Sequence, residues 1–115
     1  MTNAASAADL RGVTYVSSYL AVGTGGAVMS STDGASWTAV ASSTTNHLNA
    51  VSYFGNYKAV GGSGTVLTSA DAVTWTAQNS GTTKNLYAVA SNFSNLNVAV
   101  GAAGTIITSA DGSTW

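Results

Sequence analysis

The chain repeats itself three times at a spacing of 38 residues, and this repeat limits the fold more than any other feature. Three leucines open the segments: Leu10, Leu48 and Leu86. Each segment then carries Ala-Val-Gly, at residues 21–23, 59–61 and 99–101, with the last copy delayed by two residues. A repeat of this length is one supersecondary unit that buries its apolar surface by stacking against its neighbours. We therefore expect one domain, 1–115, with units at 10–47, 48–85 and 86–115.

Each unit is predicted to form four short antiparallel strands and no helix. β-Branched and aromatic residues alternate with period two between Gly, Asn and Asp. In the middle unit the strands are expected near residues 50–54, 58–61, 65–69 and 74–78. Tight turns containing glycine or aspartate connect them. A four-stranded sheet of about forty residues is typical of one β-propeller blade.

Every unit ends on the motif Ser-x-Asp-x-x-x-Trp, at residues 31–37, 69–75 and 109–115. Together with the Ala-Val-Gly step, this motif resembles Asp-box or BNR-type propeller repeats, most closely those of photosystem II assembly-factor-like bacterial propellers. The resemblance covers nearly the whole chain and implies an all-β propeller. Two departures are visible: Asp and Trp are four residues apart instead of the five of the sialidase form, and the second copy has Ala72 where the others have glycine.

The repeated aspartates are expected to be structural. A carboxylate in such a turn accepts backbone N–H groups of its own loop and holds the hairpin closed. A catalytic or calcium-binding set is the alternative, but equivalent places in successive units put the carboxylates far from one another. The three positions are Asp33, Asp71 and Asp111.

Aromatic residues supply the remaining candidate positions. Trp37, Trp75 and Trp115 recur at the expected start of the fourth strand, where we expect them to pack one unit on the next, with sugar stacking as the alternative. Tyr19 and Tyr57 precede the second strand in equivalent places. They are candidate ligand-binding residues, and a surface position without a ligand is the alternative.

Composition excludes several classes of function. Only 6% of residues are charged, the chain has no cysteine, and His47 is its single histidine, expected in a solvated loop. Disulfides, thiolate or zinc sites, cofactors and nucleic-acid partners are therefore not expected. Paired carboxylates for glycoside hydrolysis are missing, and Arg11 alone cannot provide the arginine cluster that the sialidase resemblance would require. We predict that the protein is not an enzyme.

No targeting or membrane segment is expected. Residues 1–10 have neither a basic start nor an apolar run of signal-peptide length, and no eighteen apolar residues occur together. The sequence therefore predicts a soluble chain without a signal peptide and leaves its location unknown.

The third unit stops at Trp115, where its fourth strand should start. Residues 1–9 occupy the place that the fourth strands hold before Leu48 and Leu86, so we predict that they form a closing strand. Propeller rings usually need four to eight blades. Two chains sharing six blades, a homodimer with exchanged strands, are therefore expected. A three-sheet β-prism is the alternative fold, although the mannose-binding signature of prism lectins is absent.

These features predict a non-enzymatic, self-assembling propeller that serves as a scaffold or protein-binding module. The alternative is a multivalent glycan-binding lectin with one weak site per unit. The regularity of the repeat is also compatible with an excised or engineered propeller fragment.

Overall fold

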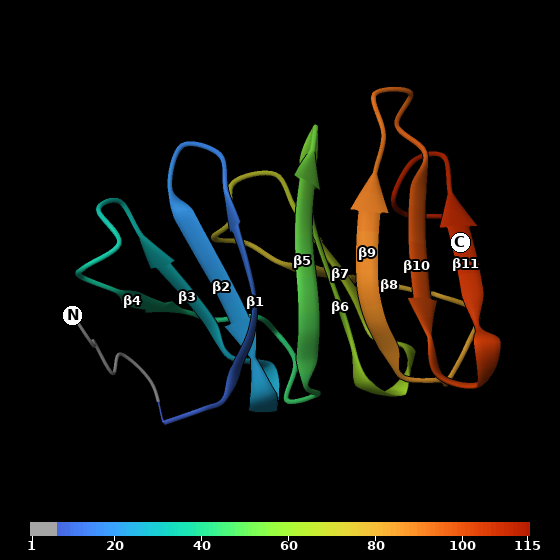
Figure 1. Ribbon diagram of the computed structural model, residues 1–115, viewed down its shortest axis with the longest axis horizontal. Helices are drawn as coiled ribbons and strands as arrows, with labels where there is room; N and C mark the ends of the chain where they lie inside the picture. Colours follow the sequence, from blue (N-terminus) through green and yellow to red (C-terminus); the bar gives the residue numbers. More distant parts are fainter. Residues whose placement is uncertain (1–6) are drawn as a thin grey trace.

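The computed structural model describes residues 7–115 and consists of three antiparallel sheets (Figure 1). Sheet 1 comprises β1 (Leu10–Tyr15), β2 (Tyr19–Gly23), β3 (Val28–Ser31) and β4 (Thr38–Val40). Sheet 2 comprises β5 (Leu48–Phe54), β6 (Asn56–Gly61), β7 (Val66–Ser69) and β8 (Thr76–Gln78). Sheet 3 comprises β9 (Leu86–Ser91), β10 (Asn97–Gly101) and β11 (Ile106–Ser109). The predicted all-β architecture of repeated sheets is confirmed, and none of the three sheets closes on itself.

The strands follow one another as hairpins in the order of the sequence. Short 3-10 turns link the second and third strands of each sheet: η1 (Thr24–Gly26), η2 (Gly62–Gly64) and η3 (Ala102–Gly104). The fourth strands begin one residue after Trp37 and Trp75 instead of at the tryptophans. In β5 the strand begins at Leu48, earlier than expected, because Leu48 pairs with Gly61 across an irregularity in the register.

Sheet 3 has three strands within the described part of the chain, where sheets 1 and 2 have four. The closing strand predicted for residues 1–9 falls mostly on residues 1–6, which lie outside the described residues. Residues 7–9 precede β1 without forming part of a strand.

Both faces of each sheet are apolar, because β-branched and small residues fill both sides of the pleat. In sheet 2, Val51 lies opposite Ala59 and Ala59 opposite Leu67, so these three share one face. Val60 pairs with Val66 on the other face. We call the face that contacts the preceding sheet the front face and the face that contacts the following sheet the rear face.

The core lies between the sheets, in two clusters. The first joins the rear face of sheet 1 to the front face of sheet 2 and contains these buried residues: Leu20, Val22, Val28, Leu48, Tyr57, Ala59, Leu67, Ala72 and Trp75. The second joins the rear face of sheet 2 to the front face of sheet 3: Val60, Val66, Leu86 and Ala99, with Val89, Ile107 and Trp115 packed against them. Each sheet therefore presents the same kind of front and rear surface to its neighbour.

The first strands β1, β5 and β9 run side by side, and the sheets contact one another mainly through them (Figure 1). Sheet 2 stands in the middle, with sheet 1 and sheet 3 on either side. No helix among residues 7–115 has the length and apolar character that crossing a membrane requires.

Candidate functional site

Each aspartate of the repeated motif closes the turn after the third strand of its sheet. Oδ1 of Asp33 accepts the backbone N–H groups of Ala35 at 2.8 Å and Ser36 at 2.9 Å, and the Ser31 hydroxyl donates to it at 3.1 Å. Asp71 and Asp111 accept the equivalent three hydrogen bonds. In all three turns the same carboxylate oxygen is taken up by the turn itself.

These hydrogen bonds lower the pKa of the three carboxyl groups, because donors favour the ionised form. The backbone N–H of Ser36 has the largest effect on Asp33, and that of Thr74 the largest on Asp71. The N–H of Thr114, followed by that of Ser113, lowers the pKa of Asp111 to about 2. Such carboxylates remain ionised at neutral pH and are poor proton donors.

The residue after each aspartate has a left-handed backbone. Gly34 and Gly112 have φ of 78° and 79°, and Ala72 in the middle copy has φ of 65°. The alanine therefore keeps the conformation that favours glycine and carries its strain. Its N–H donates to Ser69 Oγ at 2.9 Å, and its methyl group lies in the core.

The three tryptophans share a hydrogen bond but differ in burial. Each indole N–H donates to the backbone carbonyl three residues earlier in the chain. For Trp75 the acceptor is Ala72 O at 3.3 Å. Trp75 is 4% exposed and packs between sheets 1 and 2. Trp115 is half-buried at the front face of sheet 3. Trp37 is half-buried on sheet 1, where no described sheet lies in front of it.

The two candidate ligand-binding tyrosines lie in different surroundings. Tyr57 belongs to the core between sheets 1 and 2, with its ring 4.8 Å from Tyr53 and 6.2 Å from Trp75. Burial, helped by Tyr53, raises the pKa of Tyr57. Tyr19 is 38% exposed and contacts Tyr15 and Trp37 with its ring tilted against both. A ligand could therefore reach Tyr19 in this structure, whereas sheet 1 covers Tyr57.

Sequence reasoning missed two buried polar side chains at the contact between sheets 2 and 3. Lys58 stands where sheet 1 has Leu20, and its ammonium donates to the carbonyls of Phe54 at 2.6 Å and Asn56 at 3.2 Å. Burial lowers the pKa of Lys58. Asn97 stands where the other sheets have tyrosine, and its amide donates to Asn95 O at 2.9 Å. A comparison of the repeats position by position could have found both substitutions.

Lys58 and Asn97 line a polar pocket of about 380 Å³ together with Asp111. Its remaining lining residues come from the hairpin turns of sheets 2 and 3 and from the Asp111 turn: Phe54, Gly55, Asn56, Asn95 and Ala110. The hydrogen bonds of Lys58 and Asn97 are made within the protein, so this pocket offers no buried polar group in need of a ligand.

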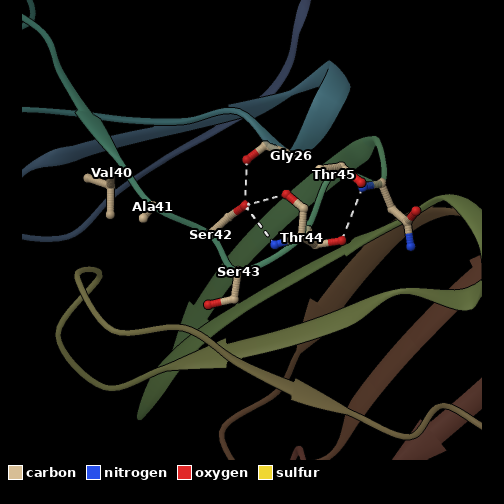
Figure 2. Close-up of a pocket in the computed structure, with 8 residues that line it drawn as sticks. Gly26, Val40, Ala41, Ser42, Ser43, Thr44 and Thr45 are labelled. Atoms are coloured by element: carbon tan, nitrogen blue, oxygen red, sulfur yellow. Dashed lines mark hydrogen bonds between the residues drawn. The ribbon is translucent and has the colours of Figure 1, made fainter.

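A larger pocket of about 700 Å³ lies along the connection from sheet 1 to sheet 2 (Figure 2). Its lining is Gly26 and residues 40–46, none of which titrates. The Ser42 hydroxyl donates to Gly26 O at 2.6 Å, and its oxygen accepts the N–H of Thr44 at 3.4 Å. This hydrogen bonding fixes the connection against sheet 1, and the pocket has no group for acid or base chemistry.

Polar side chains also link each sheet to the next at the 3-10 turns. His47 Nδ1 accepts the N–H of Gly25 at 2.9 Å, and Asn85 Oδ1 accepts the N–H of Ser63 at 3.0 Å. His47 is exposed, as expected of a loop residue, but it joins sheets 1 and 2. Sequence reasoning missed this role because it depends on a contact between units.

The outer surfaces of sheets 1 and 3 each expose apolar side chains, although Ala21 and Met29 on the outer surface of sheet 1 are only 4% exposed. The front face of sheet 1 exposes Leu10 (47%) and Val13 (64%), which line an apolar pocket of about 390 Å³ with Trp37. The rear face of sheet 3 exposes Val100 (39%) and Ile106 (67%). We call these surfaces the front end face and the rear end face. Together with the outer edge of β11, they form the candidate functional site.

No protein-family model, curated protein or solved structure matches the chain. In addition, residues 7–115 contain no group of three or more His, Asp or Glu side chains placed to hold a metal ion.

Proposed function

We propose that the chain is a non-enzymatic, self-assembling scaffold in which two copies complete a six-bladed propeller ring. The single observation that carries this proposal is the unpaired outer edge of β11. β3 pairs with β4 and β7 with β8, but β11 has no outer partner among the described residues. An open edge offers its backbone N–H and C=O groups to another strand, and natural proteins usually cover it.

The surroundings of an equivalent glycine in each sheet also indicate that a strand is missing beside β11. A Cβ built on Gly26 or Gly64 would overlap the carbonyl oxygen of Thr44 or Thr82, in the chain that leaves the fourth strand. The equivalent Gly104 has nothing within 4 Å of such a Cβ in the described chain. In sheets 1 and 2 a passing backbone segment lies so close to this glycine that no side chain would fit, and in the described part of sheet 3 no segment takes that place. A strand from residues 1–9 of a second copy would fill it.

The stacking of the sheets favours the propeller over the β-prism. Neighbouring sheets pack front face against rear face with their first strands in a row (Figure 1). Among residues 7–115, this arrangement leaves the front face of sheet 1 and the rear face of sheet 3 without a facing sheet, and part of each face is exposed. Three sheets are fewer than propeller rings usually contain, so closure requires further sheets.

Glycan binding is the second candidate, favoured by one observation. Tyr19, Tyr15 and Trp37 form an accessible aromatic group, with ring centroids 4.7 Å apart for the tyrosines and 6.4 Å for Tyr19 and Trp37. Aromatic rings of this kind stack on the apolar faces of sugars. A glycan array tests it: binding that Tyr19→Ala abolishes would support a lectin, and no binding at high protein concentration would remove this candidate.

Light scattering tests the scaffold proposal. We expect a mass of twice 11.4 kDa for the intact chain. Deletion of residues 1–8 should abolish the dimer, and replacement of residues 2–8 by a Gly-Ser sequence of equal length should do the same, because both remove the closing strand. A folded monomer of the intact chain would overturn the proposal, and an unchanged dimer after deletion would remove the strand exchange.

A further inference from the structure

The chain forms the same kind of interface twice, between sheets 1 and 2 and between sheets 2 and 3. The rear end face and the front end face carry the two sides of that interface at opposite ends of the chain. On the rear side, Val22 and Val60 are 0% exposed in the internal interfaces, whereas their equivalent Val100 is 39% exposed. Val28 and Val66 are each 1% exposed, whereas Ile106, in the same place on sheet 3, is 67% exposed. The residue types are the same or one methylene larger, and only the covering sheet is missing.

The front side shows the same relation. Leu48 and Leu86 are fully buried, and their equivalent Leu10 is 47% exposed. Trp75 is buried against sheet 1, whereas Trp37 borders the apolar pocket of the front end face. Val13 stands where Val51 packs into the internal interface. The front end face therefore has the side chains that receive a rear face elsewhere in the chain.

The polar link between sheets is also split between the two ends. His47 and Asn85 each accept an N–H from the 3-10 turn of the preceding sheet, at Gly25 and Ser63. The residue equivalent to His47 at the start of sheet 1 is Asp9, which is exposed. The N–H equivalent to those of Gly25 and Ser63 belongs to Ala103, and no described side chain accepts it. A carboxylate is a good acceptor for a backbone N–H.

We propose that the rear end face of one copy docks head to tail onto the front end face of a second copy, with the carboxylate of Asp9 accepting the N–H of Ala103. This inference rests on the proposed self-assembly and names the surfaces that meet. The occupant is a second copy because both halves of the repeated internal interface, apolar and polar, occur at opposite ends of the same chain. Such a heterologous contact closes into a ring when the rotation permits.

Two variants with complementary defects test the docking. Val13→Asp damages only the front end face, and Ile106→Asp damages only the rear end face. Each variant alone should be monomeric by light scattering, because every head-to-tail contact would include a damaged face. An equimolar mixture should form a heterodimer, because the front end face of one variant and the rear end face of the other are intact. Phe93→Asp, a matched change at a residue 93% exposed in the β9–β10 turn, should leave the wild-type mass unchanged.

The outcomes separate this inference from the proposed function. A monomeric wild-type chain would overturn both. A wild-type dimer that survives Val13→Asp and Ile106→Asp would overturn the head-to-tail docking and the six-bladed ring, and would leave only self-assembly by another surface. If only one of the two variants is monomeric and the mixture forms no heterodimer, the dimer is made by two identical faces. This result would also overturn the head-to-tail docking.

Crosslinking gives a second measurement that does not depend on damaging a face. The chain has no cysteine, so Asp9→Cys and Ala103→Cys chains can be mixed and treated with a short bismaleimide. A crosslinked dimer should form in the mixture under native conditions and should not form when the reagent is added in denaturant. The Gly25→Cys/His47→Cys double variant is the positive control, because this internal pair occupies the equivalent places. Absence of the intermolecular product, with the control crosslinked, would contradict the proposed contact.

Discussion

Left-handed backbone recurs at equivalent residues even where the side chain is not glycine. The middle residue of each 3-10 turn is Gly25, Ser63 or Ala103, with φ of 66°, 57° and 57°. The fold thus imposes one conformation on three different residues. The left-handed region costs a residue with a Cβ about 1–2 kcal/mol relative to the right-handed one, so two of the three turns store strain.

Replacing alanine by glycine in one of these turns should remove the strain there, and replacing glycine by alanine in another should introduce it. Ala103→Gly is expected to raise the free energy of unfolding by about 1 kcal/mol, because it removes the Cβ from a left-handed residue. Gly25→Ala should lower it by a similar amount, and steric overlap is not involved because nothing lies within 4 Å of the added Cβ. Urea unfolding measures both. Equal midpoints for the two variants would contradict the strain.

The aspartate turns predict a loss of stability in acid. The pKa values of Asp33, Asp71 and Asp111 are lower in the folded chain than the ordinary value of 3.8, that of Asp111 being about 2. The unfolded chain therefore binds protons first as pH falls, and the free energy of unfolding should fall between pH 4 and pH 2. Thermal unfolding across this range measures it. Replacing all three aspartates by asparagine keeps an acceptor but removes the titration, so the dependence should flatten; an equally steep curve would argue against these carboxylates.

At the residue scale, the sequence predicted what lies within one turn and missed what depends on a neighbouring sheet. The roles of the Asp-turn residues could be proposed because a carboxylate and its donors lie within three positions of one another. The burial of Lys58 and the bridging by His47 could not, because their partners are fixed by register and stacking. Ala72 was noted as a departure from the glycine of the other copies, but the sign of its φ needed the structure.

At the scale of the sheets, the repeated sequence places apolar side chains on both faces of every sheet. Period-two patterning predicted the strands, and the Ala-Val-Gly step places small residues where sheets approach closely. Strand ends were predicted less well, because the irregularity at Leu48 and the late start of β8 depend on the register with the neighbouring strands β6 and β7. The number of sheets and their hairpin order followed from the spacing alone.

The buried tryptophan should dominate the packing of sheet 2 on sheet 1. Trp75→Ala is expected to lower the free energy of unfolding by about 3–5 kcal/mol, because it removes a large side chain from a filled interface. Trp37→Ala, the matched change at a half-buried place, should cost less than half as much. Both are compared by urea unfolding in an Ile106→Asp background, which the docking inference expects to be monomeric. Equal losses would show that sheet 1 is already covered in the single chain.

At the scale of the molecule, contacts are arranged along a row and the core is divided into two separate clusters. Such an array has no internal means of covering its first and last surfaces. The exposure of Leu10, Val13, Val100 and Ile106 is therefore a property of the arrangement and not of any one residue. The sequence allowed this to be expected from the count of three repeats, whereas the pairing of the two surfaces required the geometry.

The separation of the core into clusters between interchangeable faces also has a consequence for how such chains can change in length. Duplicating one 38-residue segment in the gene inserts a sheet whose two sides resemble those of its new neighbours, and the interfaces differ mainly at the places of Lys58 and Asn97. Chains with more sheets would then arise by copying, and their rings would differ in blade number while keeping the same interfaces.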